Sequence, residues 1–159
     1  MSKTSDSPDS KAGAGVPFET TLHVRDHCLC LAARRAARAL SRRFDEALRP
    51  AGLTNGQFSL LMSLNRPEPP TMGSVATLLA MDRTTLTAIL KPLQRRGLVE
   101  TTVDKADRRG RRLRLTQAGQ EVLQAAVPIW RRTHAEVDRD LAATGAAPDT
   151  LRQGLRAIA

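Results

Sequence analysis

The chain is poor in aromatic residues and in cysteine. Among its 159 residues are three Phe, one Trp and no Tyr. Proteins that bind single-stranded nucleic acid or RNA stack bases on aromatic side chains, so this scarcity argues against that class. Cysteine is limited to Cys28 and Cys30. Two cysteines cannot form the disulfide framework of a small secreted domain, and they favour a reducing, cytoplasmic location.

Long apolar runs and the signatures of common enzymes are also absent. No stretch of 18 apolar residues occurs, so we expect no membrane partner. The sequence has no glycine-rich phosphate loop, no Gly-x-Ser-x-Gly elbow and no Cys-x-x-Cys pair. We therefore expect neither an enzyme nor a cofactor. Residues 1–19 begin with a Ser-, Gly-, Asp- and Pro-rich stretch that lacks the apolar segment of a secretion signal, and we expect a disordered arm there.

Positive charge is abundant. Lys and Arg number 25 against 16 Asp and Glu, which gives a net charge of +9 and a pI near 11.1. Such a balance favours a polyanionic partner, most often nucleic acid.

Apolar residues recur at helical spacing over most of the chain. Thr54, with Gln57 three residues later, has the pattern of a capping box that starts a helix. The buried stripe expected for that helix is Phe58, Leu61, Met62 and Leu64. A short strand is expected at Thr71–Met72. Helices are expected over residues 20–48, from Thr54, over 74–80, from Asp82 to Gly97, over 116–142 and from Pro148.

A β-hairpin is expected between the fourth and fifth of these helices. Residues 98–103 form its first strand, and Arg112–Leu115 alternates polar and apolar side chains as a half-buried second strand does. Thr116 is the expected N-cap of the helix that follows. The tip of the hairpin is rich in arginine, which suits a DNA groove because Arg follows the negative potential of the backbone.

The run from Asp104 to Gly119 combines Asp, a short gap, Asp-Arg-Arg, a short strand and Leu-Thr-x-x-Gly. This run resembles the wing of the MarR family of winged helix-turn-helix transcriptional regulators. The resemblance implies a mainly α fold, a winged helix-turn-helix with a two-stranded β-wing, whose N- and C-terminal helices form a dimerisation region. We accordingly expect the DNA-binding domain over residues 53–115 and the helical dimerisation region over residues 20–52 and 116–159.

The helix that begins at Asp82 is the expected recognition helix. Arg83 near its start has the donors to read a guanine, and Thr84 and Thr87 offer hydroxyl and methyl groups to base edges or phosphates. Arg109 and Arg111 at the hairpin tip are expected to enter the minor groove. The full expected set of DNA-binding residues is Arg83, Thr84, Thr85, Thr87, Lys91, Arg108, Arg109, Arg111 and Arg112.

The hairpin also needs internal support. Asp104 and Asp107 are too acidic for a phosphate-facing surface unless each is paired. By the family resemblance, Asp107 and Arg108 take part in ion pairs that brace the wing, and Asp104 belongs to the same bracing set. Arg112 and Arg114 share a strand face and are expected to meet phosphates or acidic neighbours.

Together these features predict a sequence-specific regulator that binds double-stranded DNA as a homodimer on a palindromic operator. The resemblance implies a repressor released by a small-molecule effector, often an aromatic or phenolic compound. The direction of regulation depends on where the operator lies relative to the promoter, so activation stays open. A different class is a basic protein that coats DNA without sequence preference, and base preference separates the two.

Cys28 and Cys30 support an alternative, redox-sensing regulator. Leu29-Cys30-Leu31-Ala32 resembles a stretch of the organic-peroxide-sensing branch of the family, although that branch supports its cysteine with tyrosines and this chain has none. On one continuous helix the two thiols lie about 200° apart, so we expect any disulfide to join two subunits. Buried inert thiols are the competing interpretation.

A metal site is the last alternative. His23 and His27 stand at i and i+4, a spacing that puts two imidazoles on one helix face. Further ligands would have to come from Cys30, Asp26 or another subunit. Surface histidines are the favoured interpretation, and we expect no metal.

Overall fold

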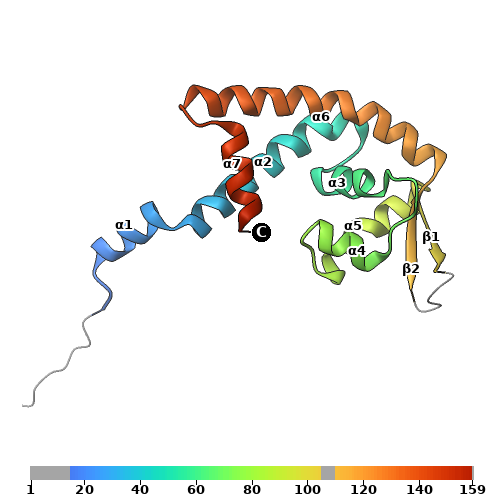
Figure 1. Cartoon of the computed structure of the whole chain (residues 1–159), viewed down its shortest axis with the longest axis horizontal. Coiled ribbons are helices and arrows are strands. Elements are labelled where there is room, and N and C mark those ends of the chain that lie inside the picture. The colour runs from blue at the N-terminus through green and yellow to red at the C-terminus, as the bar shows by residue number, and fades with distance from the viewer. Residues whose placement is uncertain (1–14, 105–109, 159) are drawn as a thin grey trace, which may run out of the picture. The chain divides into compact units, whose positions relative to one another are not determined.

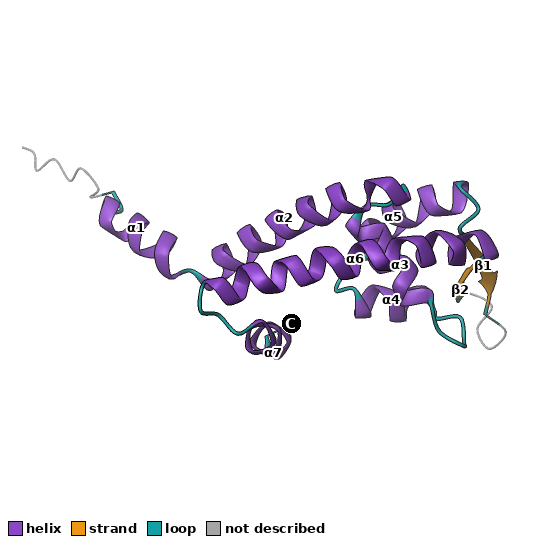
Figure 2. Ribbon diagram, turned by 90° about the horizontal axis from the view of Figure 1, so that it is seen from above, coloured by secondary structure: helices purple, strands orange, loops and turns teal. Residues whose placement is uncertain are grey.

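The computed structural model of the chain describes residues 15–104 and 110–158 (Figures 1 and 2). The chain divides into two compact units, Met1–Arg38 and Ala39–Ala159, and the boundary between them falls inside one helix. Asp107, Arg108 and Arg109 lie outside the described residues, as do residues 1–14 of the expected N-terminal arm. The elements in chain order are α1 (Phe18–His27), α2 (Leu29–Leu48), the 3-10 helix η1 (Arg49–Ala51), α3 (Asn55–Leu64), α4 (Met72–Leu78), α5 (Arg83–Arg95), β1 (Val99–Val103), β2 (Arg111–Leu115), α6 (Gln117–Ala143) and α7 (Pro148–Ala157).

The first unit contains α1 and the beginning of α2, where one continuous helix was expected. That expectation was wrong, because Cys28 has an extended backbone with φ −75° and ψ 103°. Its N–H donates to the carbonyl oxygen of Val24 at 2.9 Å, and its own carbonyl accepts from Ala32 N–H at 3.0 Å. Cys28 therefore ends one helix and begins the next. The apolar period continues across the break, which is why the side-chain pattern did not reveal it.

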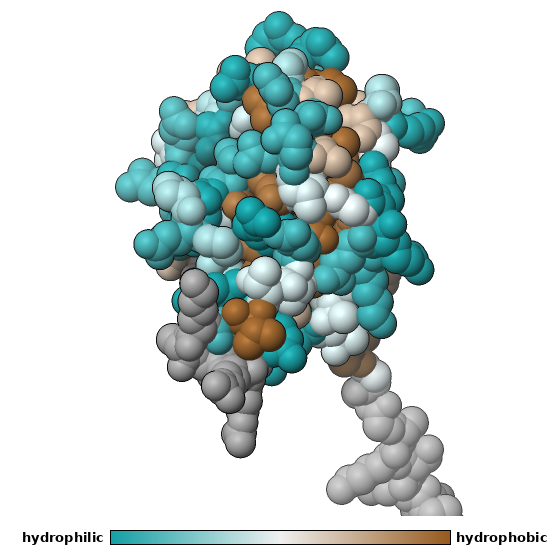
Figure 3. Space-filling model, turned by 90° about the vertical axis from the view of Figure 1, so that its right-hand side faces the viewer, coloured by the Kyte–Doolittle hydropathy of each residue, from teal (hydrophilic) through white to brown (hydrophobic). Residues whose placement is uncertain are grey.

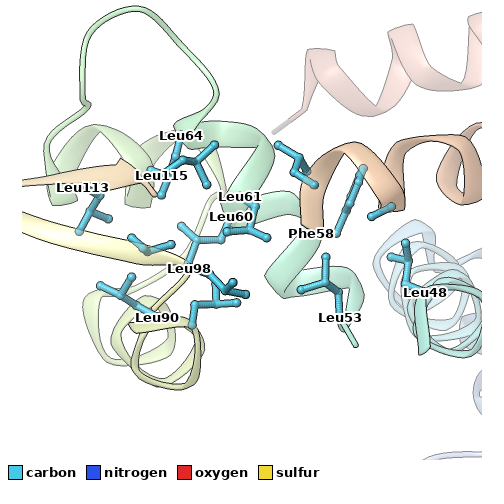
Figure 4. Packing of buried hydrophobic residues seen from close by; sticks show 14 of the residues in the cluster. Leu48, Leu53, Phe58, Leu60, Leu61, Leu64, Leu90, Leu98, Leu113 and Leu115 are labelled. Carbon is cyan, nitrogen blue, oxygen red and sulfur yellow. The ribbon is translucent and has the colours of Figure 1, made fainter. Parts of the chain in front are cut away.

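The core of the second unit is built around α3, which contacts α4, α5, α6 and β2 (Figure 4). Leucine supplies most of its buried side chains. The buried apolar residues are Phe44, Leu48, Leu53, Phe58, Leu60, Leu61, Leu64, Val75, Leu86, Leu90, Leu93, Leu98, Val99, Leu113, Leu115, Leu123, Ala126 and Val137.

The capping box at the start of α3 is confirmed. Thr54 Oγ1 accepts from Gln57 N–H at 3.2 Å, and Gln57 Oε1 accepts from Thr54 N–H at 3.1 Å. The expected stripe was only partly right, since Met62 is 41% exposed whereas Leu60 is fully buried. Neighbours surround α3 on more than one side, so its buried surface is wider than one stripe.

Thr71 has two roles. A short strand at Thr71–Met72 and a separate helix over residues 74–80 were expected from the sequence. Thr71 forms a single antiparallel bridge with Arg112, and its hydroxyl accepts from Ser74 N–H at 3.1 Å to cap α4. Met72 is therefore the first residue of the helix and not part of a strand. An extended Thr at an N-cap allows both contacts, because the N-cap position has non-helical backbone angles.

The expected hairpin is confirmed as an antiparallel pair. Val99 pairs with Leu115, and the register runs to Val103 opposite Arg111. Val99, Leu113 and Leu115 are buried on one face. Alternation therefore directs the apolar face to the core and leaves the basic face toward solvent.

The second strand joins α6 at a closely packed junction. Thr116 Oγ1 donates to the carbonyl oxygen of Gly97 at 2.6 Å and accepts from Gly119 N–H at 3.0 Å, so the expected N-cap is confirmed. A Cβ on Gly119 would lie 2.1 Å from the carbonyl oxygen of Leu98. Only glycine fits there without displacing backbone, which gives a physical reason for Leu-Thr-x-x-Gly.

Apolar surface remains uncovered in each unit. In the first unit Phe18, Val24 and Leu29 are exposed, and in the second unit so are Leu151 and Leu155 of α7. None of the described helices is both long and apolar enough to cross a lipid bilayer.

We expect Gly119→Ala to lower the free energy of unfolding by about 1–3 kcal/mol, because the added methyl group overlaps the Leu98 carbonyl. Gly154→Ala is the matched control, since Gly154 is helical with open space around its Cβ position, and it should leave stability unchanged or raise it by about 0.5–1 kcal/mol. Urea denaturation followed by circular dichroism measures both. Equal stabilities of the two variants would contradict the close packing at this junction.

Candidate nucleic-acid interface

Helix α5 presents an exposed polar face. Asp82 caps the helix, and its carboxylate accepts from the backbone N–H of Thr85 at 2.8 Å and from the Thr85 hydroxyl at 2.7 Å. These hydrogen bonds, the backbone one first, hold the pKa of Asp82 below its usual range. Leu86, Leu90 and Leu93 anchor the opposite face in the core. The start of α5 is thus fixed at both its cap and its buried side.

Five residues of this face line one shallow surface hollow: Arg83, Thr84, Thr87, Ala88 and Lys91. Arg83, Thr84 and Lys91 are exposed, and Thr87 is half-buried. The hydroxyl of Thr87 donates to the carbonyl oxygen of Arg83 at 2.7 Å, so its hydrogen is already used and its oxygen remains an acceptor. Four of the residues expected to read DNA therefore lie together.

Thr85 differs from the other four residues expected on this helix. Both its N–H and its hydroxyl are bonded to Asp82. Its polar groups support the start of α5, and the same bonds occupy one of the N–H groups that a helix N-terminus otherwise offers to phosphate.

An ion pair with a buried carboxylate braces the hairpin. Asp104 is 6% exposed, and its Oδ2 lies 3.0 Å from Nε of Arg112. Arg112 also donates through Nη1 to the carbonyl oxygen of Pro69 at 2.8 Å. Leu113 N–H donates to the carbonyl oxygen of Pro70 at 2.9 Å. The hairpin is thereby attached to the segment between α3 and α4, a connection that sequence reasoning missed because the partners are distant along the chain.

Two further contacts join the hairpin to its surroundings. Arg114 Nε donates to Glu100 Oε1 at 2.5 Å across the strands, so this arginine meets an acidic neighbour as expected. Gln94 of α5 donates to the hydroxyl of Thr101 at 2.7 Å and links the helix to β1. Gln94 lies outside the expected site, and nothing in the sequence marked this pairing.

Arg111 is the described arginine nearest the hairpin tip. It is exposed, and its Nη1 donates to the carbonyl oxygen of Gly110 at 3.2 Å. The part of the surface seen from the hairpin end is predominantly hydrophilic (Figure 3). α5 and β1 are in contact, so the polar helix face and the hairpin belong to one continuous region of the second unit.

A second concave region lies between α3, α4 and α6 in the same unit, with a volume of about 460 Å³; we call it the apolar pocket. Trp130 stacks on Phe58 with ring centroids 6.0 Å apart and contacts His134 at 4.7 Å. The apolar pocket is lined by Phe58, Ser59, Met62, Ser63, Leu78, Leu79, Val127, Trp130 and Arg131. Sequence reasoning missed this pocket, although the single tryptophan on an expected helix was a signal.

The cysteines and histidines of the first unit lie around the break between α1 and α2. Cys28 Sγ accepts from Leu31 N–H at 3.4 Å, and Cys30 is exposed. The interpretation of Cys30 as a buried thiol is therefore wrong for the single chain. The rings of His23 and His27 stack with centroids 4.2 Å apart. Within residues 15–104 and 110–158, no group of three or more His, Cys, Asp or Glu side chains is placed to hold a metal ion.

Comparisons with known proteins agree with this geometry. A model of the MarR family matches residues 51–110. The transcriptional repressor NicR of Pseudomonas putida is 30% identical, and the match covers 83% of this chain and 80% of NicR. The transcriptional activatory protein BadR of Rhodopseudomonas palustris is 28% identical, and the match covers 86% of this chain and 77% of BadR. Among solved structures, the M. tuberculosis transcriptional regulator MosR in complex with DNA is 42% identical in sequence and has a TM-score of 0.71. The match covers 82% of this chain and 92% of the MosR chain.

We expect Asp104→Ala to destabilise the protein by about 1–3 kcal/mol, because the change removes the buried partner of Arg112. Glu100→Ala is the control, since it breaks the more exposed pair with Arg114 and should cost less than about 1 kcal/mol. Urea denaturation of both variants gives the comparison. A loss for Asp104→Ala no larger than that for Glu100→Ala would show that the brace has no structural role.

Proposed function

Because the chain belongs to the MarR family of winged-helix transcriptional regulators, we propose that it binds a palindromic operator as a homodimer in the cytoplasm and that a small molecule releases it. The observation that supports this proposal is the exposed, positively charged face of α5 beside a braced, arginine-rich hairpin. A helix of this kind fits the major groove, and the wing then follows the adjacent backbone.

The side chains of the interface have different tasks in this proposal. Arg83 reads a guanine through two hydrogen bonds, while the methyl groups of Thr84 and Thr87 contact thymine or exclude water. Lys91, one helical turn beyond Thr87, meets a phosphate. Arg111, together with Arg108 and Arg109 outside the described residues, contacts the minor groove and its phosphates. This group supplies affinity that depends steeply on salt.

We assign Arg112 and Thr85 to support and not to contact with DNA. The guanidinium of Arg112 already meets Asp104 and Pro69, and Thr85 is bonded to Asp82. Moving the Arg112 side chain to DNA would take its guanidinium away from the buried carboxylate of Asp104 and from the carbonyl oxygen of Pro69. Moving the Thr85 hydroxyl would break its hydrogen bond with Asp82.

A second copy of the chain is the proposed cover for the exposed apolar surface. Phe18, Val24 and Leu29 in the first unit and Leu151 and Leu155 in the second are all exposed in the single chain. A two-fold dimer presents two α5 helices to successive major grooves, which is the reason for a palindromic site.

The apolar pocket is the proposed effector site. Phe58 and Trp130 form an aromatic wall that suits a flat ring, and Arg131 at the edge offers five N–H donors to an oxygen of the ligand. We propose that the ligand is aromatic or phenolic and that it relieves repression. NicR is likewise named a repressor. BadR is named an activator, so the direction depends on the promoter and not on the fold.

Thiol oxidation is a second candidate signal, and the position of Cys28 at the helix break favours it. The Cys28 sulfur accepts the N–H of Leu31, which is the bond a helix cap makes. With hydrogen peroxide as the oxidant, two thiols give up two electrons and two protons, a disulfide forms, and the O–O bond breaks to give two molecules of water. A disulfide would turn the sulfur away from Leu31 and leave the start of α2 uncapped.

We expect peroxide to abolish operator binding by the wild type and dithiothreitol to restore it if this candidate is correct. Cys28→Ser should bind DNA normally and ignore peroxide, because a Ser hydroxyl caps a helix but forms no disulfide. Cys30→Ser, with non-reducing mass analysis, identifies whether Cys30 or a thiol of the second copy is the partner. A Cys28→Ser variant that responds to peroxide like the wild type excludes Cys28 as the sensing thiol.

The test of the proposed function is selection of bound duplexes from a random pool, followed by fluorescence anisotropy across a salt series. We expect a palindrome with half-sites about one helical turn apart. The logarithm of affinity should fall with the logarithm of salt by about 0.9 per neutralised phosphate. Salt-dependent binding without an enriched sequence would instead support a protein that coats DNA.

Arg83→Ala should weaken operator binding by about 1–3 kcal/mol and relax preference at one base pair per half-site. Arg139→Ala removes the same charge from an exposed position of α6 and serves as the control, with preference unchanged. Unaltered affinity and preference in Arg83→Ala would mean that α5 does not read the bases.

A further inference from the structure

The two strands of the hairpin are attached to their surroundings in different ways. On the β2 side, Leu113 N–H donates to the carbonyl oxygen of Pro70, and the ion pair of Arg112 adds to this attachment. On the other side, β1 lies beside α5 (Figure 1). Within residues 15–104 and 110–158, the hydrogen bond from Gln94 Nε2 to Thr101 Oγ1 is the only one that joins a side chain of α5 to a side chain of the hairpin.

Packing of β1 against the core ends before Thr101. Side chains alternate between the two faces of a strand, so Val99, Thr101 and Val103 share the face that packs into the core. Val99 is buried, Thr101 is exposed, and Val103, which pairs with Arg111, is 55% exposed. Beyond Val99, the bond to Gln94 therefore takes the place of apolar packing on the β1 side.

The other end of this bond is fixed to the core. The carbonyl oxygen of Gln94 accepts from Gly97 N–H at 2.9 Å, and the neighbouring Leu93 is fully buried. Lys91, which lines the hollow on the polar face of α5, lies one turn earlier on the same helix. A movement of Thr101 away from Gln94 is therefore a movement of β1 relative to the helix that is proposed to read DNA.

The length of the bond limits how far the hairpin can tilt. A strand rises by about 3.3 Å per residue, so Val103 lies about twice as far from Val99 as Thr101 does. A tilt about Val99 that moves Thr101 by about 1 Å therefore moves Val103 and its partner Arg111 by about 2 Å. Directed away from α5, the same tilt stretches the 2.7 Å bond to about 3.7 Å, which is too long for a hydrogen bond.

We propose that Gln94 is a positioning residue for DNA binding. Its bond to Thr101 sets the distance between the bases that α5 reads and the minor groove that Arg111 enters. Contacts to phosphates fix the register of a protein on a duplex, so the two groups of contacts form together only at one spacing. A neutral glutamine thus controls contacts that cations make. This inference rests on the proposed function, which gives α5 and the hairpin these two tasks.

The salt dependence of binding separates this role from a direct contact between Gln94 and DNA. Counterions are released by Lys and Arg that neutralise phosphates, so the loss of a neutral donor alone leaves the salt slope unchanged. For a positioning residue, Gln94→Ala should lower the slope by about 0.9 for each phosphate that a cation of the hairpin no longer neutralises. We expect operator binding about tenfold weaker at moderate salt, with base preference unchanged.

A second variant tests the other partner of the bond. Thr101→Val removes the hydroxyl at nearly constant volume and should have the same effect as Gln94→Ala. The double variant should lose no more than either single variant, because both changes break one bond. Thr101→Ser keeps the hydroxyl and should bind like the wild type. Gln117→Ala is the matched control, since Gln117 is an exposed glutamine bonded to Glu121 at 3.1 Å, and it should keep both affinity and slope.

Fluorescence anisotropy with the selected operator across a salt series measures affinity and slope. Urea midpoints of the variants should stay close to that of the wild type, because Gln94 and Thr101 are both exposed. An unchanged slope in Gln94→Ala, additive losses in the double variant, an altered base preference or a markedly lower urea midpoint would each overturn the proposal. If the wild type binds its operator and Gln94→Ala binds it equally well, this inference alone is wrong, whereas failure of the wild type to enrich any duplex contradicts the proposed function.

Discussion

The close approach of α6 to the start of the hairpin is the constraint on which the second unit depends. At Gly119 the helix comes so near to the Leu98 carbonyl that no side chain fits, and Thr116 ties the same point to Gly97. The end of α5, the start of β1, the end of β2 and the start of α6 therefore meet within a few residues. Because backbone atoms make this contact, α6 cannot shift without moving α5 and the hairpin.

Positive charge in this protein serves two purposes that composition does not distinguish. Arg83 and Lys91 extend from the surface as exposed cations. Arg112 and Arg96 point to carbonyl oxygens instead, with Arg96 Nη1 donating to Gly52 at 2.6 Å. Guanidinium groups suit both tasks because their five donors can satisfy several acceptors at once. A basic pI therefore overstates how many cations are available to a polyanion.

Local chemistry made much of the fold predictable. The caps at Thr54, Asp82 and Thr116 follow from short-range hydrogen bonds, and the hairpin follows from alternation, so sequence alone identified them. The break at Cys28 was not predictable from periodicity. The exposed position of Met62 could not be read from the sequence either, because it depends on which helices surround α3.

The candidate site divides in the same way. The outward face of α5 follows from its own period, but the bond of Arg112 to Pro69 and the apolar pocket arise from residues far apart in sequence. No local pattern encodes such pairs.

Attachment of the segment from Pro69 to Thr71 along β2 has a consequence for the behaviour of the protein at high concentration. An open strand edge presents unpaired N–H and carbonyl groups that can recruit the strand of another molecule. Here Leu113 N–H is bonded to Pro70 and Thr71 forms a bridge with Arg112, so the outer edge of the strand is already covered. Proline has no N–H, which prevents this cover from extending the sheet further. β2 therefore lies at the molecular surface with its outer edge closed at Arg112 and Leu113 to the strand of another molecule.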